Sequence, residues 1–275
     1  IKVKEGTVRC VVGGAVRGMS LNGAPVPMLE TFTLTEDEVL VMRASKGGVF
    51  SYLAFEGGIA GTPSFGSFSV HRRAGLGSPL TRPFEGGDVL DVGTAQAGSE
   101  RSLSLPQTAT GPVRCVLGPQ DDYFSPAMIE QFFATDWVIS ATSDRMGYRL
   151  EGPPLTHARS PNIVSDGIAY GSLQIPGNGQ PLLLLADRGT TGGYPKIATV
   201  ITADLGRAAQ TPVGTVINFR PVPIEEAQTI TRQFNQMIRS LPQQCRLVGQ
   251  EGISSDILFA GHGAGQAVNA LDPHG

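Results

Sequence analysis

The sequence has little cysteine and tryptophan, with three and one of these among its 275 residues. The cysteines (Cys10, Cys115 and Cys245) are odd in number and far apart, unlike the disulfide framework of a small secreted domain. A reduced, cytoplasmic protein is the simplest interpretation. No apolar run approaches the roughly 20 residues of a membrane-spanning helix, and the first residues lack a signal-peptide core. We therefore expect no membrane partner.

Several catalytic motifs are also missing. The sequence contains no G-x-x-x-x-G-K-[ST] run, no G-x-S-x-G elbow and no H-E-x-x-H pair. Its four histidines have no metal-ligand spacing, so we expect no metal site. Lys and Arg are scattered and the net charge is -3, which argues against a nucleic-acid partner. These absences exclude the commonest hydrolase, oxidoreductase and NTPase mechanisms, but they allow ATP to enter a complex through another chain.

Glycine and proline are plentiful, at 36 and 20 residues, which suits a β-rich fold with many turns. Short apolar runs at 8–12, 38–42 and 50–55 predict strands, and Asn22-Gly23 predicts a tight turn. Residues 126–133 and 224–241 carry helical patterns, the first with Ser125 as its N-cap and Pro126 in its first turn.

A change in composition divides the chain. The polar, irregular stretch from residue 99 ends in Gly111-Pro112, which marks a boundary. We expect an N-terminal β subdomain at 1–110, a second β subdomain at 111–223, and a C-terminal helix with a flexible tail at 224–275. The tail includes Gly261-His262-Gly263-Ala264-Gly265, which lacks the last glycine of a dinucleotide-binding fingerprint.

The most unusual segment is the polar loop 186–196, between apolar runs at 182–185 and 197–201. An ordinary turn does not need an acid, two bases, two hydroxyls and a phenol. Loops held by a rigid sheet often carry binding groups, so we predict that this loop forms one wall of a site. The alternative is a polar hairpin tip. The candidate residues here are Asp187, Thr190, Thr191, Gly192, Gly193, Tyr194 and Lys196.

Two further segments carry candidate groups. In 143–153, Arg145 and Arg149 offer guanidinium forks for oxyanions, with Asp144 or Glu151 to hold one of them; a structural ion-pair cluster is the alternative. In 57–69, backbone N–H groups and the Ser67 hydroxyl are suited to an oxyanion, although a plain glycine-rich connection is the alternative.

Together these segments resemble the second-subunit family of allophanate hydrolase, also named the biotin-dependent carboxyltransferase family. Its members include the C subunit of 5-oxoprolinase, antagonists of a sporulation-kinase inhibitor, and part of the carboxyltransferase domain of urea carboxylase. The resemblance covers most of residues 10–220, and the runs 143–153 and 186–196 are its most specific parts. It implies a mainly β fold with two cyclophilin-like β-barrel subdomains, a few short helices and a C-terminal helix.

The sequence also departs from the family pattern. Relatives begin with a further segment bearing a Gln-Asp-x-Gly-Arg type motif, so the N-terminal barrel is expected to be incomplete. Relatives commonly carry Arg where Phe68 stands and Gln where Gly189 stands. These two changes remove polar groups from candidate site loops. They weaken the case for intact activity and slightly favour a non-catalytic binding role.

The resemblance implies a subunit of an ATP-dependent 5-oxoprolinase-type amidohydrolase complex, which opens 5-oxoproline to glutamate. The implied partners are a homologous β-rich subunit, like the B subunit of 5-oxoprolinase, and a third subunit. ATP would act at the level of the complex. Two alternatives stay open: carboxyl transfer to urea or a related amide from carboxybiotin on a separate carrier, and a non-catalytic antagonist that binds a kinase inhibitor.

For the leading hypothesis we assign roles but name no single nucleophile. The expected catalytic residues are Asp187, Lys196 and Arg145. The expected substrate-binding residues are Ser67, Arg149, Tyr148, Gln174, Thr190, Thr191, Gly192, Gly193 and Tyr194.

Overall fold

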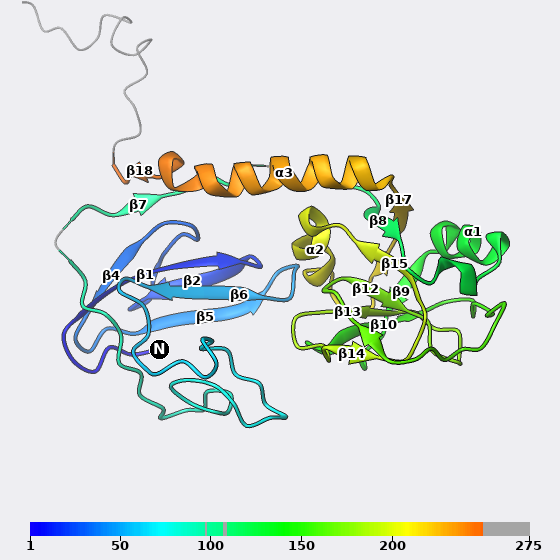
Figure 1. Ribbon diagram of the computed structural model, residues 1–275. Helices are drawn as coiled ribbons and strands as arrows, with labels where there is room; N and C mark the ends of the chain where they lie inside the picture. The colour runs from blue at the N-terminus through cyan, green and yellow to red at the C-terminus, as the bar shows by residue number, and fades with distance from the viewer. Residues whose placement is uncertain (97, 107–108, 250–275) are drawn as a thin grey trace, which may run out of the picture.

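The computed structural model describes residues 1–96, 98–106 and 109–249 (Figure 1). Most of the tail predicted to be loosely held, which begins after Pro242, lies outside the described residues, including its 261–265 run. The chain is mainly β with few helices, as predicted, and its parts form two halves bridged by one long helix, α3 (Ile224–Ser240).

The C-terminal half is built on one barrel-like sheet of eight strands in the order β16-β9-β10-β13-β12-β15-β8-β17. Neighbours are antiparallel except β17 and β8, which run parallel. The strands are β8 (Val113–Leu117), β9 (Trp137–Ile139), β10 (Gly147–Glu151), β12 (Ser172–Gln174), β13 (Leu182–Leu184), β15 (Lys196–Val200), β16 (Val216–Ile217) and β17 (Phe219–Pro221).

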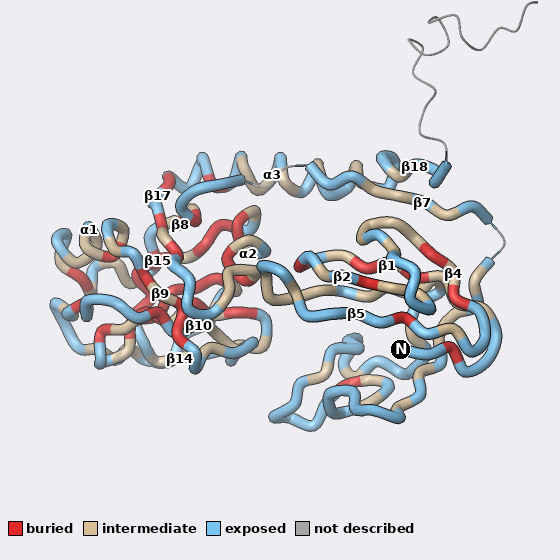
Figure 2. Tube along the Cα trace, turned by 180° about the vertical axis from the view of Figure 1, so that it is seen from behind, coloured by how far each residue is buried: buried red, intermediate tan, exposed pale blue. Residues whose placement is uncertain are grey.

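One face of this sheet carries the main hydrophobic core. Alternate strand residues point inward, because successive side chains of a strand lie on opposite faces, and Leu150, Leu173 and Leu183 are fully buried. Helix α1 (Pro126–Ala134) closes the core: its Phe132 ring stacks on Phe219 with 5.3 Å between ring centroids. This helix is the predicted one, and its expected cap is present, since Ser125 accepts from the backbone N–H of Met128. Figure 2 shows most of the buried chain gathered in this half.

The N-terminal half holds two small sheets and a smaller core. The first has the order β4-β1-β6 and the second the order β3-β2-β5. Asn22 and Gly23 form the predicted turn between β2 and β3, both with positive φ, at 49° and 88°. The strands are β1 (Thr7–Gly14), β2 (Arg17–Leu21), β3 (Ala24–Pro25), β4 (Phe32–Thr35), β5 (Leu40–Ser45) and β6 (Ser51–Phe55).

Residues 56–96 follow β6 as a long segment held by isolated bridges and turns rather than by strands. Beyond it, the short strand β7 (Arg101–Ser102) pairs with β18 (Arg246–Leu247). Part of the stretch after Pro242 is therefore ordered by pairing, which the sequence analysis did not foresee. The remaining elements are β11 (Asp166–Gly167), β14 (Thr191–Gly192) and two 3₁₀ turns, η1 (Asp121–Tyr123) and η2 (Leu241–Gln244).

Helix α2 (Thr202–Ala209) was also not predicted, and the reason is physical. It has no side-chain cap, it contains a glycine, and it is only eight residues long, so local propensity favours it weakly. Its formation depends on tertiary contacts, above all on Asp204, which is completely buried.

Asp204 ties together three segments of the C-terminal half. Its carboxylate accepts two hydrogen bonds from the Arg114 guanidinium, at 3.0 and 2.6 Å, and one from the Arg114 backbone N–H at 2.8 Å. Arg207 donates to it at 2.9 Å and also bonds the Gly111 and Pro112 carbonyls. The network fixes α2 against β8 and against the chain that enters this half.

Burial alone would raise the pKa of Asp204, but the hydrogen bonds from Arg114 and Arg207 outweigh it and hold the pKa below its ordinary value. We predict that Asp204→Ala lowers the free energy of unfolding by about 3 kcal/mol or more, because it leaves two guanidinium groups without their buried partner. Chemical denaturation of the variant measures this loss.

Since the folded pKa of Asp204 is lowered, its contribution is complete above the unfolded carboxyl value and falls as pH drops below about 4. The exposed Glu225 is the matched control, and Glu225→Gln is expected to change stability by less than about 0.5 kcal/mol. Equal losses in the two variants would contradict the assignment.

Candidate anion-binding site

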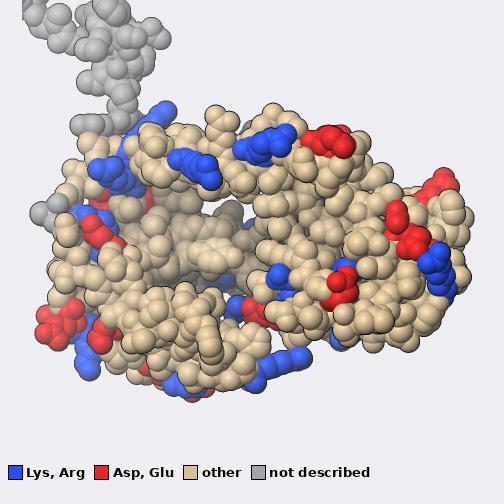
Figure 3. All heavy atoms as spheres, viewed as in Figure 1, with Lys and Arg blue, Asp and Glu red and all other residues tan. Residues whose placement is uncertain are grey.

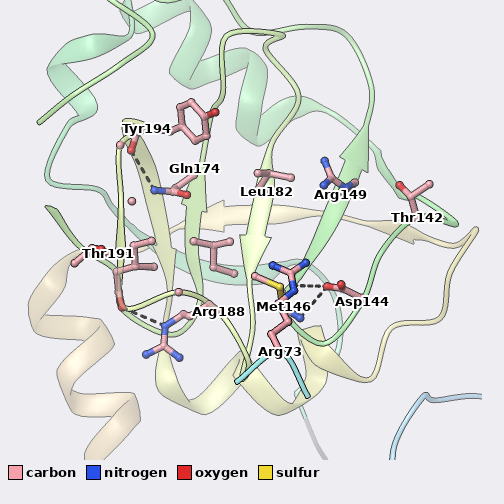
Figure 4. A pocket seen from close by; sticks show the side chains of 16 residues that line it. Arg73, Thr142, Asp144, Met146, Arg149, Gln174, Leu182, Arg188, Thr191 and Tyr194 are labelled. Atoms are coloured by element: carbon pink, nitrogen blue, oxygen red, sulfur yellow. Dashed lines mark hydrogen bonds between the residues drawn. The ribbon is translucent and has the colours of Figure 1, made fainter. Parts of the chain in front are cut away.

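A cavity of about 390 Å³ lies on the face of the eight-stranded sheet opposite the core, and Figure 4 shows the 16 residues that line it. They come from β10, β12 and β13, from the connection 142–146 before β10, from Ile168 after β11, from the loop 188–194, and from one residue of the N-terminal half, Arg73. The cavity therefore combines two of the three segments singled out in the sequence.

Strand register places three of these side chains in one row. Arg149 on β10 is paired with Leu182 on β13, and Leu182 is paired in turn with Gln174 on β12. Directly paired residues project from the same face of a sheet, so the three line the cavity together. Their neighbours Tyr148, Leu183 and Leu173 form the parallel row on the core face.

The loop after β13 folds back over this row. Its β14 residues Thr191 and Gly192 pair with Gly167 and Asp166 of β11, forming a two-stranded ribbon beside the main sheet. A Cβ atom on Gly192 would lie 2.6 Å from Ile168 Cδ1 and 2.8 Å from Gln174 Nε2. A larger residue there would push the Ile168 and Gln174 side chains aside, so glycine suits this close approach.

Gln174 is the central polar group of the floor. It is 4% exposed, and its Nε2 donates to the Tyr194 carbonyl at 3.3 Å. Within the described residues its Oε1 makes no hydrogen bond. The amide is thus fixed in orientation and leaves an acceptor for a ligand N–H group.

The lining carries more positive than negative charge. Arg73, Arg149 and Arg188 contribute guanidinium groups, whereas Asp144 is the one acidic residue among the lining side chains that the structure describes. The Asp144 carboxylate accepts two hydrogen bonds, both from backbone N–H groups: Met146 at 2.9 Å and Gly147 at 3.3 Å. The cavity is therefore suited to an anionic ligand, since guanidinium forks match carboxylate and phosphate oxygens.

Arg188 is anchored within the fold. Its Nε donates to the Ile168 carbonyl at 3.1 Å, and its guanidinium lies over the Tyr170 ring, 5.7 Å from the centroid. Arg149, in contrast, makes no side-chain hydrogen bond within the described part of the chain. Arg188 helps to shape the cavity, while Arg149 stays available to a ligand.

Six of the predicted substrate-binding residues line the cavity, as does Gly189. The six are Arg149, Gln174, Thr191, Gly192, Gly193 and Tyr194. Thr190 lies next to them, and its carbonyl accepts from the Ile168 N–H at 3.0 Å, which ties the loop to the ribbon. Their roles in ligand binding stay predictions.

The three residues predicted to be catalytic lie beside the cavity rather than in its lining. Arg145 donates to Asp187 at 3.0 Å across the rim, and more than half of the Arg145 side chain is exposed. Neither Asp144 nor Glu151, proposed from the sequence as partners for an arginine, holds this guanidinium. An exposed pair of this kind contributes about 0–1 kcal/mol.

Lys196 is 3% exposed and lies under the ribbon. Its Nζ donates to Asp166 Oδ2 at 2.6 Å and to the Gly167 carbonyl at 3.2 Å. The hydrogen bond from Lys196 also lowers the pKa of Asp166. The geometry gives Lys196 a positioning role, because it holds β11 and through it the paired loop.

Two further residues predicted to bind substrate, Tyr148 and Ser67, lie outside the cavity lining. Tyr148 points into the core, where it is 3% exposed and its hydroxyl donates to the Ala209 carbonyl at 2.5 Å; burial raises its pKa to about 12. Ser67 ends the tight turn that begins at Ser64, is exposed, and accepts from the Ser69 N–H. It does not line the cavity, which instead receives Arg73, four residues beyond the end of the predicted 57–69 segment.

The sequence analysis missed Arg73, Arg188 and Thr142 as lining residues. Arg188 was inside the candidate loop, and it was counted among the bases without a role. For Arg73, the available signal was the pair of adjacent arginines, Arg72-Arg73, near a glycine-rich segment. No sequence pattern marked Thr142.

Within the described residues, no group of three or more His, Cys, Asp or Glu side chains is placed to hold a metal ion. The same part of the chain contains no helix long and apolar enough to cross a membrane.

The fold and the cavity define a mainly β protein with a barrel-like sheet and a cationic cavity on one of its faces. The chain belongs to the carboxyltransferase domain family, subdomains A and B, whose model matches residues 1–221. The resemblance stated from the sequence is thereby confirmed.

Among curated relatives, the C subunit of 5-oxoprolinase from Escherichia coli is 37% identical over 203 residues, which cover 72% of this chain and 66% of the relative. The corresponding protein of Haemophilus influenzae is 35% identical, with coverage of 81% and 72%. The crystal structure of the urea amidolyase from Kluyveromyces lactis matches with a TM-score of 0.78 and 24% identity, over 86% of this chain and 16% of that one. This last likeness concerns the fold.

The opposite orientation of Tyr148 and Arg149 gives a sharp prediction. Tyr148→Phe should lower stability by about 1–3 kcal/mol, because it leaves the buried Ala209 carbonyl without its donor, and should leave ligand affinity nearly unchanged. Arg149→Gln should leave stability nearly unchanged and should lower the affinity for an anionic ligand. Denaturation curves and ligand titrations of the two variants measure both effects, and a loss of affinity in Tyr148→Phe alone would overturn the face assignment.

Proposed function

We propose that this chain is a subunit of an ATP-dependent amidohydrolase complex that opens 5-oxoproline to glutamate. The observation that carries the proposal is the cavity on the sheet, which places guanidinium groups beside an oriented amide, in a chain similar to the C subunit of 5-oxoprolinase. 5-Oxoproline is a small lactam with one carboxylate, so it needs both kinds of group.

In this proposal Arg149 attracts the negative oxygens of the substrate, while Gln174 Oε1 accepts from the lactam N–H. Opening the ring adds water across the amide bond: the carbonyl carbon gains a hydroxyl, and the ring nitrogen leaves with a proton as an amine. The carbonyl oxygen gains negative charge on the way, and the fixed cationic groups stabilise it without reorganising. Thr191 and Tyr194 form part of the wall of this site.

The flanking residues support this arrangement. The Arg145–Asp187 pair holds the start of the loop at the rim, and Lys196 holds the ribbon beneath it. We assign a positioning role to Arg145, Asp187 and Lys196. They would contribute to activity by holding the loop and the ribbon in place.

The proposed setting is a cytoplasmic complex with a homologous β-rich subunit and a third subunit. Three free thiols, two of them buried, fit a reducing compartment. ATP hydrolysis would supply the free energy for ring opening. The sequence contains no G-x-x-x-x-G-K-[ST] run, so we place the nucleotide on another subunit.

Carboxyl transfer from carboxybiotin to urea or a related amide is the second candidate. The observation that favours it is the match to the carboxyltransferase family over residues 1–221. Biotin would arrive on a separate carrier, and the same cationic cavity would receive its carboxylate. A kinase-inhibitor antagonist, the third possibility, would bind its partner without turnover of either amide.

The test reconstitutes this chain with its partner subunits and measures glutamate release from 5-oxoproline with and without ATP. We expect ATP-coupled release, and a loss in kcat/KM of about 10- to 100-fold in Arg149→Gln, the range expected for a hydrogen bond to a charged group. Carboxylation of urea, measured with carboxybiotin in the same preparation, distinguishes the second candidate.

The combined variant Lys196→Ala/Arg145→Ala tests the flanking residues. We expect clearly reduced activity, because the ribbon and the rim both lose their ion pairs. Activity equal to that of the unaltered complex would remove both residues from the site, and binding of a kinase inhibitor without turnover would favour the antagonist.

A further inference from the structure

Arg73 is the one described residue of the N-terminal half that lines the cavity. In Figure 4 it comes from a separate stretch of chain, and in this view its guanidinium group is drawn beside Met146 and Asp144, below Arg149 and Leu182. Within the described residues it makes neither a hydrogen bond nor an ion pair. A guanidinium group that enters a cationic cavity without a protein partner is a group available to an anion.

The backbone around Arg73 is well defined. Residues 71–76 form a tight hairpin: the His71 N–H donates to the Leu76 carbonyl at 2.8 Å, and the Ala74 N–H donates to His71 Nδ1 at 3.1 Å. Arg72 and Arg73 are at its tip, and only Arg73 lines the cavity. The hairpin therefore sets where the backbone of Arg73 lies, and its side chain is exposed.

The segment that carries the hairpin is attached to the N-terminal half at its base. The Ala60 N–H donates to the Asp91 carbonyl at 2.8 Å, and the Gly93 N–H donates to the Gly58 carbonyl at 3.0 Å. Where Arg73 lies thus depends on how the two halves meet. In Figure 3 an opening separates the two halves directly beneath α3, and they approach each other below that opening.

The Gln210 side chain fastens the two halves together. Its Oε1 accepts from the backbone N–H groups of Val49 and Phe50, at 2.7 and 2.8 Å, and its Nε2 donates to the Phe50 carbonyl at 2.8 Å. The amide pairs with the connection between β5 and β6 as a neighbouring strand would. Phe50 also packs against the main core of the C-terminal half.

This contact is joined to the floor of the cavity. Gln210 directly follows Ala209, whose carbonyl accepts the Tyr148 hydroxyl on strand β10. Tyr148 in turn precedes Arg149. Neighbouring residues therefore hold both parts of the cavity: the Tyr148–Ala209 hydrogen bond fixes the strand that carries Arg149, and Gln210 fixes the half that carries Arg73.

We propose that Arg73 is a specificity-determining residue that pairs with the carboxylate of the amide substrate opposite Arg149, and that Gln210 is the positioning residue that keeps it there. The site is then composite, with one cation from each half. This inference rests on the proposed function for the identity of the substrate, but not for the existence of the two-sided anion site.

The experiment uses the assembled complex and two probes, 5-oxoproline and its uncharged analogue 2-pyrrolidinone. In Arg73→Gln we expect KM for 5-oxoproline to rise about tenfold or more with kcat within about twofold, the pattern of a lost binding contact. Binding of 2-pyrrolidinone, measured by titration, should not change. Arg72→Gln, at the same hairpin tip, is the matched control and should behave as the unaltered complex.

A double-mutant cycle tests the role of Gln210. Gln210→Ala should raise KM when Arg73 is present and should have little further effect in Arg73→Gln, because the two residues act in series. Equal effects in both backgrounds would reduce Gln210 to a structural residue. An unchanged melting temperature in Arg73→Gln excludes loss of folding as the cause.

The two hypotheses fail in different ways. Turnover of 5-oxoproline with KM unaffected by Arg73→Gln overturns the composite site and leaves the proposed function intact. Carboxylate-dependent binding that is lost in Arg73→Gln, without any turnover, supports the composite site and overturns the function. Absence of binding of either probe to the unaltered complex overturns both.

Discussion

The pairing of β10, β13 and β12 is the constraint on which the candidate site depends. Because side chains alternate between the two faces of a strand, the register that buries Tyr148, Leu183 and Leu173 also places Arg149, Leu182 and Gln174 on the other face. The same strand register therefore determines both the core and the lining of the cavity. A slip of one residue in any of these strands would exchange them, and the hydrophobic core makes such a slip costly.

Several polar groups shape the cavity from outside it, because they hold backbone segments in place and do not line the cavity themselves. Lys196 fixes the β11–β14 ribbon through Asp166, and Gly192 allows that ribbon to approach Gln174. Asp204 fixes α2, which carries Gln210 at its end. The charged residues that first draw attention in the sequence are thus mostly supports, and the groups left for a ligand are few.

The sequence predicted much of the local structure. The helix capped by Ser125, the Asn22-Gly23 turn and the mainly β class follow from short-range rules, because capping, positive φ and apolar periodicity are properties of neighbouring residues. Helix α2 and the pairing of β18 with β7 were not predicted, since both depend on partners far away in the chain. The position of Tyr148 on the core face could not be read from a run of polar residues taken as a unit, because alternate residues of a strand face opposite ways.

The sequence by itself determined which segments carry unusual chemistry, and it indicated the family, because residue types and their spacing are visible there. The tertiary structure decided which side chains meet. Arg149 and Gln174 became neighbours through strand register, and Arg73 reached the same cavity through the junction of the two halves. Contacts between residues far apart in the chain are fixed by packing and pairing, and these are properties of the folded chain as a whole.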